Sequence, residues 1–204
     1  MSEKDEALQH LSEIKSVLVD KDAFFPYNYN ALIVWGVIGM IMTLFMGMLL
    51  KSSILTGTVF SLVMMSVGFV IEGFLVKQVN QKYDIDDCTK RQRFISTMFT
   101  MLTIFSIALS ALLAKYDLIV LAYLVWLFAC AIGYFSIGFV LNLSIFTKSA
   151  YLKIAVSVLL LISSYFVTDL GSLNSPFFYL VQSVTFVLLG ILPIMIGRKL
   201  KEEL

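Results

Sequence analysis

The sequence has few charged residues for its length. Of its 204 residues, 14% are charged and 59% are apolar, whereas a soluble domain is typically about 25% charged and about 45–50% apolar. This balance indicates an integral membrane protein. Six spans of roughly 20 residues would use about 120 residues, which leaves little chain for a soluble domain. The 15 basic and 14 acidic residues nearly cancel, which argues against a nucleic-acid-binding surface.

Histidine and cysteine are also scarce. A single histidine, His10, excludes a bis-histidine haem site and a histidine-rich metal cluster. Cys88 and Cys130 are too far apart in the sequence to form a paired-thiol redox motif. The acidic loop 84–87 lacks the glycine and the final glutamate of a calcium-binding loop. We therefore predict no catalytic, metal or cofactor site and no enzyme of a familiar type, with a lipid-acting enzyme as a minor alternative.

Long apolar runs, separated by short polar segments, define the predicted topology. They predict six membrane-spanning helices arranged as three hairpins: 31–50, 53–76, 94–114, 118–143, 154–168 and 177–197. The fifth run is short, and we expect this span to extend back to Tyr151, with Lys153 snorkelling to the interface. The sequence thus predicts an all-α polytopic protein with a transmembrane domain over 31–197, an entry segment over 1–30 and a tail over 198–204.

Lysine and arginine fall mostly on one side of this topology. Thirteen of them lie on the side of the termini and the 77–93 loop, whereas only Lys51 and Lys115 lie on the other side. Cytoplasmic loops carry the excess of lysine and arginine. Both termini are therefore predicted to be cytoplasmic, in a protein of the cell (inner) membrane.

Residues 5–19 have the spacing of a short amphipathic helix. Their apolar face is formed by Leu8, Leu11, Ile14 and Leu18. Over residues 1–22 there are six acids and three lysines, whereas helices that lie on lipid are rich in basic residues. We predict that this helix docks on protein, either the ends of its own bundle or a partner, with a position on the lipid surface as the alternative.

Small residues recur along the first two predicted spans. They are Gly39, Thr43 and Gly47 in the first span, and Gly57, Ser61 and Gly68 in the second. Small side chains let helix backbones approach closely. This pattern predicts a tightly packed first hairpin.

Glu72 is the only ionisable residue predicted to lie well inside a span. A charge at the bilayer centre costs roughly 2.5–3.5 kcal/mol, and such residues are often functional. For Glu72 we favour a structural ion pair with Lys77, Lys153 or Arg198, because the predicted span ends only about 6 Å away, at Val76. A proton or cation site is the alternative.

Other polar residues in the spans are weaker candidates for ligand contacts. They are Tyr123, Tyr134 and Gln182. In the last span, Gly190 and Pro193 follow Gln182, and this order predicts a polar contact followed by a kink.

Two similar seven-residue segments occur late in the second and fourth spans. They are GFVIEGF (Gly68–Phe74) and GYFSIGF (Gly133–Phe139). They fit either a duplicated hairpin or chance similarity in an apolar sequence. In layout over 31–197, the chain resembles the small six-helix bacterial inner-membrane proteins of the HdeD type. The resemblance implies a non-catalytic membrane protein linked to stress tolerance or regulation, and it assigns no functional residues.

The sequence favours a non-enzymatic membrane protein that acts through interactions, as an accessory or regulatory subunit or as a homo-oligomer. Its partners would be the lipid bilayer and either another copy or a membrane or cytoplasmic protein. The alternative is a small transporter or substrate-binding membrane component, similar in size to those of vitamin uptake systems. In that alternative, Glu72 and neighbouring polar residues contact a small-molecule ligand.

Overall fold

The computed structural model describes residues 26–83, 85 and 88–202. Within these ranges the chain forms six helices that are long and apolar enough to cross a membrane, which confirms the predicted all-α, six-span fold. The first five are α2 (Asn30–Ser52), α3 (Ile54–Lys82), α4 (Lys90–Lys115), α5 (Ile119–Leu141) and α6 (Ser144–Ser164). The predicted amphipathic helix, with Leu8, Leu11, Ile14 and Leu18, lies outside the described residues.

The sixth span consists of three consecutive segments. It begins as α7 (Pro176–Thr185), continues as a π-helical turn, η1 (Phe186–Ile191), and ends as α8 (Leu192–Glu202). Pro193 lies just after the π-helical turn, where its missing N–H removes a backbone hydrogen bond. The irregularity expected near Gly190 and Pro193 is therefore present as a change of helix type.

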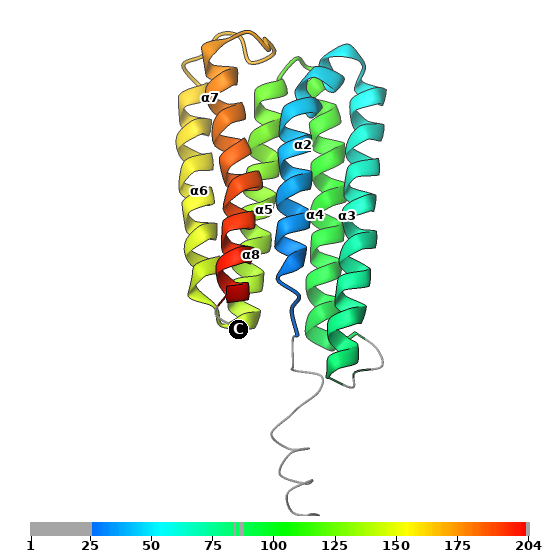
Figure 1. Cartoon of the computed structure of the whole chain (residues 1–204). Coiled ribbons are helices and arrows are strands. Elements are labelled where there is room, and N and C mark those ends of the chain that lie inside the picture. Colours follow the sequence, from blue (N-terminus) through cyan, green and yellow to red (C-terminus); the bar gives the residue numbers. More distant parts are fainter. Residues whose placement is uncertain (1–25, 84, 86–87, 203–204) are drawn as a thin grey trace, which may run out of the picture.

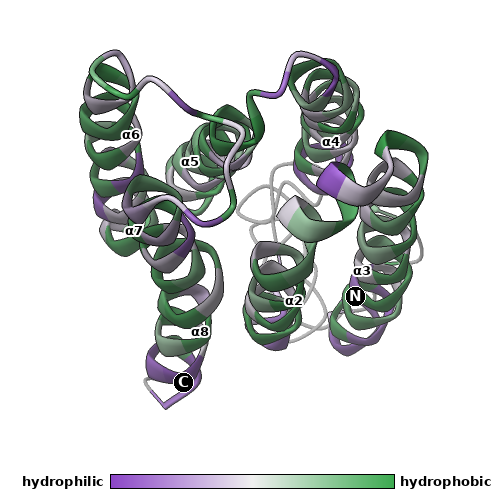
Figure 2. Cartoon of the chain, turned by 90° about the horizontal axis from the view of Figure 1, so that it is seen from above, coloured by the Kyte–Doolittle hydropathy of each residue, from purple (hydrophilic) through white to green (hydrophobic). Residues whose placement is uncertain are grey.

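Helices α2 and α5 form the centre of the bundle (Figures 1 and 2). Helix α5 contacts α2, α4, α6 and α7, whereas α2 contacts α3, α5 and the sixth span. In Figure 2 apolar residues dominate all the helices, because the outer faces of the bundle carry large apolar side chains such as Phe74, Phe105 and Leu159. These outward faces suit contact with lipid chains.

The third hairpin differs from the first two. Helices α2 and α3 pack on each other, as do α4 and α5, but α6 packs chiefly on α5 and the sixth span packs chiefly on α2. A connection over residues 165–175 separates α6 from α7. By contrast, Ser53 alone separates α2 from α3. The longer connection allows α6 and the sixth span to pack against different helices.

Helix α6 corrects the predicted fifth span. We expected the span to cover the run 154–168 and to extend back no further than Tyr151, but the helix begins at Ser144 and ends at Ser164. Lys153 is consequently the tenth of 21 helical residues and lies about 14 Å along the axis from the first. The charge of Lys153 had suggested the end of the span, whereas the helix continues on both sides of this residue.

Side-chain caps mark the ends of several helices. Thr89 and Gln92 form a capping box at the start of α4, in which each side chain accepts a backbone N–H of the other residue. Gln92 also exchanges hydrogen bonds with the side chain of Asn80 near the end of α3 and donates one to the carbonyl of Pro26. This buried network joins the entry to α2, the end of α3 and the start of α4.

Glycines permit the closest approach of α2 to the sixth span. A Cβ on Gly39 would lie only 2.4 Å from the Leu189 carbonyl oxygen, and one on Gly36 would lie 2.6 Å from the Gly190 oxygen. Gly57 and Gly68 approach α2 from α3, as the small-residue pattern predicted. Gly39, however, faces the sixth span and not α3.

We predict that glycine-to-alanine substitution destabilises the protein at Gly39 but not at Gly73. Gly39→Ala forces α2 away from the sixth span and lowers the free energy of unfolding by about 1–3 kcal/mol. Gly73→Ala, in α3, meets no atom within 4 Å and is expected to be neutral or to stabilise by up to about 1 kcal/mol through helix propensity. Thermal unfolding in detergent measures both, and equal destabilisation of the two variants would contradict the packing described.

Candidate functional site

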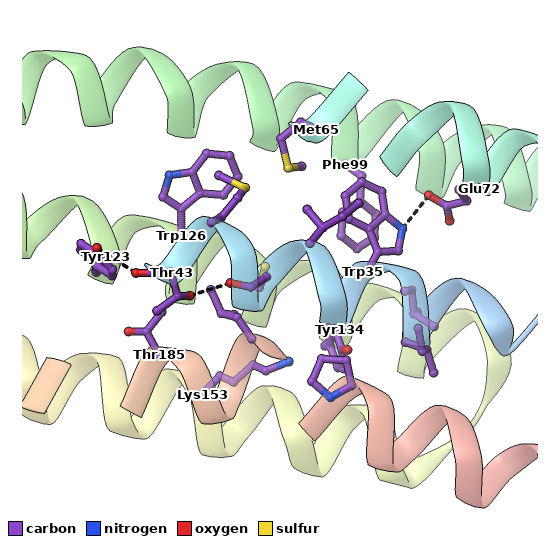
Figure 3. Close-up of a pocket in the computed structure, with 18 of the residues that line it drawn as sticks. Trp35, Thr43, Met65, Glu72, Phe99, Tyr123, Trp126, Tyr134, Lys153 and Thr185 are labelled. Atoms are coloured by element: carbon purple, nitrogen blue, oxygen red, sulfur yellow. Dashed lines mark hydrogen bonds between the residues drawn. The ribbon is translucent and has the colours of Figure 1, made fainter. Parts of the chain in front are cut away.

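A cavity of about 90 Å³ lies between α2, α5, α6 and the sixth span, with residues of α3 and α4 on one side (Figure 3). Most of its wall is apolar or aromatic. The lining includes Trp35, Met42, Met65, Phe99, Trp126 and Leu189 among others. A cavity with mostly apolar walls and a few polar groups is typical of a small-molecule site.

Lys153 is the least expected residue in this wall. Its side chain is 0% exposed, and its Nζ lies 3.1 Å from the centroid of the Tyr134 ring. An ammonium group over an aromatic face gains a cation–π attraction. The predicted snorkelling of Lys153 is therefore wrong, because the residue lies in the middle of its helix with its amino group inside the bundle, beside Tyr134 (Figure 3).

Three buried polar atoms of this wall have no hydrogen-bond partner among the described residues. They are Lys153 Nζ, Tyr134 Oη and Thr185 Oγ1, which we call the cavity donors. Thr185 is 1% exposed and Tyr134 is 6% exposed. Buried polar groups are nearly always paired; these three are not, and neither are Ser106 Oγ and Ser149 Oγ, which do not line this cavity.

Glu72 lies at another side of the same cavity. Its carboxylate accepts a hydrogen bond of 3.0 Å from the indole N–H of Trp35, which links α3 to α2 (Figure 3). No residue in the described ranges forms an ion pair with Glu72. The expected ion pair with Lys77, Lys153 or Arg198 is therefore not what stabilises this carboxylate. Lys153 is a second ionisable residue inside the spans, which the sequence prediction missed.

Tyr123 and Gln182 meet at the backbone of α2. The Tyr123 hydroxyl donates to the Thr43 carbonyl and accepts from the Gly47 N–H, at 3.0 and 3.1 Å. These two backbone groups are four residues apart and would normally bond to each other. Gln182 donates a further hydrogen bond of 3.0 Å to the Thr43 carbonyl.

The position of the Tyr123 hydroxyl, between the Thr43 carbonyl and the Gly47 N–H, explains why position 47 is a glycine. A Cβ on Gly47 would lie 2.7 Å from the Tyr123 hydroxyl oxygen. A side chain placed between the carbonyl and N–H groups of a helix opens it locally. Tyr123 and Gln182 thus shape α2 beside the cavity, and their own polar groups are already bonded. Of the four candidate polar residues, Tyr134 and Glu72 have the stronger claim to contact a ligand.

A larger cleft of about 1050 Å³ adjoins the cavity between α3 and α4. Tyr27, Glu72 and Phe99 line both spaces. Burial raises the pKa of Tyr27 well above its usual value, so its hydroxyl stays neutral at the junction. The cleft lies on the half of the bundle that carries Pro26 and the α3–α4 loop.

A short predicted span was the one signal in the sequence that could have revealed Lys153. Fifteen residues are too few to cross a bilayer as a helix, and extending the span by two turns towards the N-terminus places Lys153 inside it. Trp35 and Thr185 gave no such signal, because their roles depend on contacts with other helices.

The described residues contain no cluster of three or more histidine, cysteine, aspartate or glutamate side chains that could hold a metal ion. Comparisons of the chain with family models, curated proteins and solved structures find no match. The case for a function therefore rests on the geometry of the cavity. The similarity in layout to HdeD-type proteins stays a prediction.

We predict that Lys153→Met stabilises the fold. Methionine fills a similar volume without a buried, unpaired amino group, so we expect the free energy of unfolding to rise by about 1–3 kcal/mol in ligand-free detergent solution. Lys148→Met, at an exposed position of the same helix, should change it by less than about 0.5 kcal/mol. Thermal unfolding of both variants tests the assignment, and a less stable Lys153→Met protein would contradict it.

Proposed function

We propose that this multi-pass membrane protein binds a small molecule inside its helical bundle, as a substrate-binding membrane component or a small transporter. The observation that carries the proposal is the amino group of Lys153, buried at mid-span and facing the central cavity. Ionisable residues inside spans are costly and usually mark ligand or ion sites.

The cost of Lys153 supports binding over a purely structural role. An apolar residue would pack as well between α5 and α6 without a buried amine, and natural proteins commonly give up stability at functional positions. The alternative, in which the chain acts through protein partners, depends on the amphipathic helix of residues 5–19. That helix lies outside the described residues, so the interaction hypothesis stays a prediction.

The proposed orientation places the α3–α4 loop in the cytoplasm of a cell with the protein in its inner membrane. With Lys153 moved into a span, twelve lysines and arginines remain on the predicted cytoplasmic side and two on the other. The split still follows the positive-inside rule. The wide cleft between α3 and α4 would then lie in the cytoplasmic half.

The test is to identify small molecules that co-purify with the protein. The wild-type chain, Lys153→Met and Lys148→Met would be extracted in a mild detergent and compared by native mass spectrometry. We expect a bound small molecule in the wild-type protein and in Lys148→Met, and its loss from Lys153→Met. The same bound molecules in all three proteins, or none in any of them, would contradict the proposal.

A further inference from the structure

We propose that the cavity binds a small monovalent carboxylate. This inference rests on the proposed function and names the ligand class for the same site. Its basis is the set of cavity donors, Lys153 Nζ, Tyr134 Oη and Thr185 Oγ1, which come from α6, α5 and the sixth span and line one cavity.

The charge of the ligand follows from the charged residues in the wall. Lys153 supplies one positive charge, and an ammonium removed from water is stabilised by an anion that accepts its hydrogen bonds. Glu72 lines the same cavity and disfavours a second negative charge on the ligand. A monovalent anion is therefore favoured over a cation or a divalent anion.

The chemistry of the three donors favours a carboxylate. An ammonium group can only donate hydrogen bonds, and a hydroxyl group can donate one. The two oxygens of a carboxylate accept several hydrogen bonds, which matches the ammonium of Lys153 and the hydroxyl of the adjacent Tyr134. Thr185 lies nearer the Tyr123 end of the cavity (Figure 3). The remaining wall, with Ile38, Met42 and Leu189, suits a short alkyl group.

The volume of the cavity limits the length of the ligand. About 90 Å³ is several times the space that one buried water molecule needs. A carboxylate with one to three carbon atoms fits this space. A benzoate or a hexanoate would require the helices to move apart.

The experiment measures thermal stabilisation of the purified wild-type protein by sodium salts at constant ionic strength. Formate, acetate and propionate should raise the melting temperature in a saturable way, because a ligand that binds only the folded state stabilises it. Chloride, sulfate, hexanoate and benzoate should not. Equal effects of acetate and chloride, or a preference for sulfate, would overturn the assignment to a carboxylate.

Variants of the cavity donors test which groups bind the carboxylate. Lys153→Met should weaken acetate binding about tenfold or more, since it removes a charged donor. Tyr134→Phe should weaken it roughly fivefold, whereas Thr185→Val, nearer the Tyr123 end of the cavity (Figure 3), should weaken it less. Ser106→Ala is the matched control, because the Ser106 hydroxyl is also buried without a described partner but lines a different cavity. Equal affinity in the control and the three donor variants would overturn the proposed site.

These two experiments distinguish a wrong ligand class from a wrong proposed function. If another small molecule binds in a way that requires Lys153 while carboxylates do not bind, the ligand class is wrong and the binding function stands. If no ligand depends on Lys153, both proposals fail.

A second inference concerns the path by which the ligand reaches Lys153, and it rests on the contact between the cavity and the adjoining cleft. We propose that it enters from the cleft between α3 and α4 and passes the Trp35–Glu72 hydrogen bond. The cleft and the cavity share Tyr27, Glu72 and Phe99. Trp35 bonds to Glu72 and packs edge-on against Phe69, with ring centroids 5.3 Å apart, and Phe69 lines the cleft. The indole therefore separates the two spaces.

The two cysteines of the chain report on this passage without any added mutation. Cys88 lines the cleft and Cys130 lines the cavity. Iodoacetate is a small carboxylate that alkylates a thiolate with loss of iodide, so its rate at Cys130 measures entry of a carboxylate. Mass spectrometry of peptides gives the rates at the two cysteines in one sample.

We predict that Trp35→Phe accelerates alkylation of Cys130 by iodoacetate several-fold relative to Cys88. The matched control is Trp126→Phe, because the Trp126 indole also lines the cavity but donates to Ser110 on α4. Trp126→Phe should leave the ratio of the two rates unchanged. If Trp35→Phe leaves it unchanged as well, or if both variants raise it equally, the proposed passage is wrong even where acetate still binds.

Discussion

The burial of one amino group in an apolar bundle is the constraint on which the rest of the account depends. Lys153 lies in the middle of α6, with its Nζ against the face of Tyr134 on α5. The attraction between the ammonium and the ring offsets part of the cost of removing the charge from water. No described residue accepts a hydrogen bond from Lys153 Nζ in the cavity, so the remaining cost is not offset by such a bond within the described chain.

Two irregular helix segments border this cavity. In α2, the Tyr123 hydroxyl occupies the place of a backbone hydrogen bond between Thr43 and Gly47. In the sixth span, the chain forms a π-helical turn at Phe186–Ile191, opposite the glycines of α2. Both features interrupt regular helix packing where the two elements meet. π-Helical turns occur frequently at functional sites, and this one contributes Leu189 to the cavity wall.

The number and order of the helices could be predicted from the sequence, because apolar runs of the length of a bilayer are a strong local signal. The site could be predicted only in part. Glu72 and Tyr134 stood out as polar residues in apolar runs, and both line the cavity. Lys153 was placed at the edge of the fifth span, with its amino group at the interface, since a charge at the edge of an apolar run usually marks its end. Its true position depends on Tyr134, which belongs to another helix.

The roles of other residues depend on three-dimensional contacts that no sequence spacing reveals. Gly39 faces the sixth span, 150 positions from Leu189 in the sequence, and Tyr123 reaches across to α2. Trp35 was not a candidate, because a tryptophan in an apolar span is an ordinary lipid- or core-facing residue. The hydrogen bond that its indole donates to Glu72 depends on the packing of α2 against α3, which the sequence does not give.

The most direct test of the account is a distance measurement by solid-state NMR between ¹⁵N-labelled lysine side chains and ¹³C-carboxyl acetate. If Lys153 binds a carboxylate, the carboxyl carbon lies about 3–4 Å from a single lysine nitrogen, as expected for a charge-assisted hydrogen bond. The signal should be absent in Lys153→Met and present in Lys148→Met. A signal that persists in Lys153→Met, or no short distance in the wild-type protein, would contradict the account.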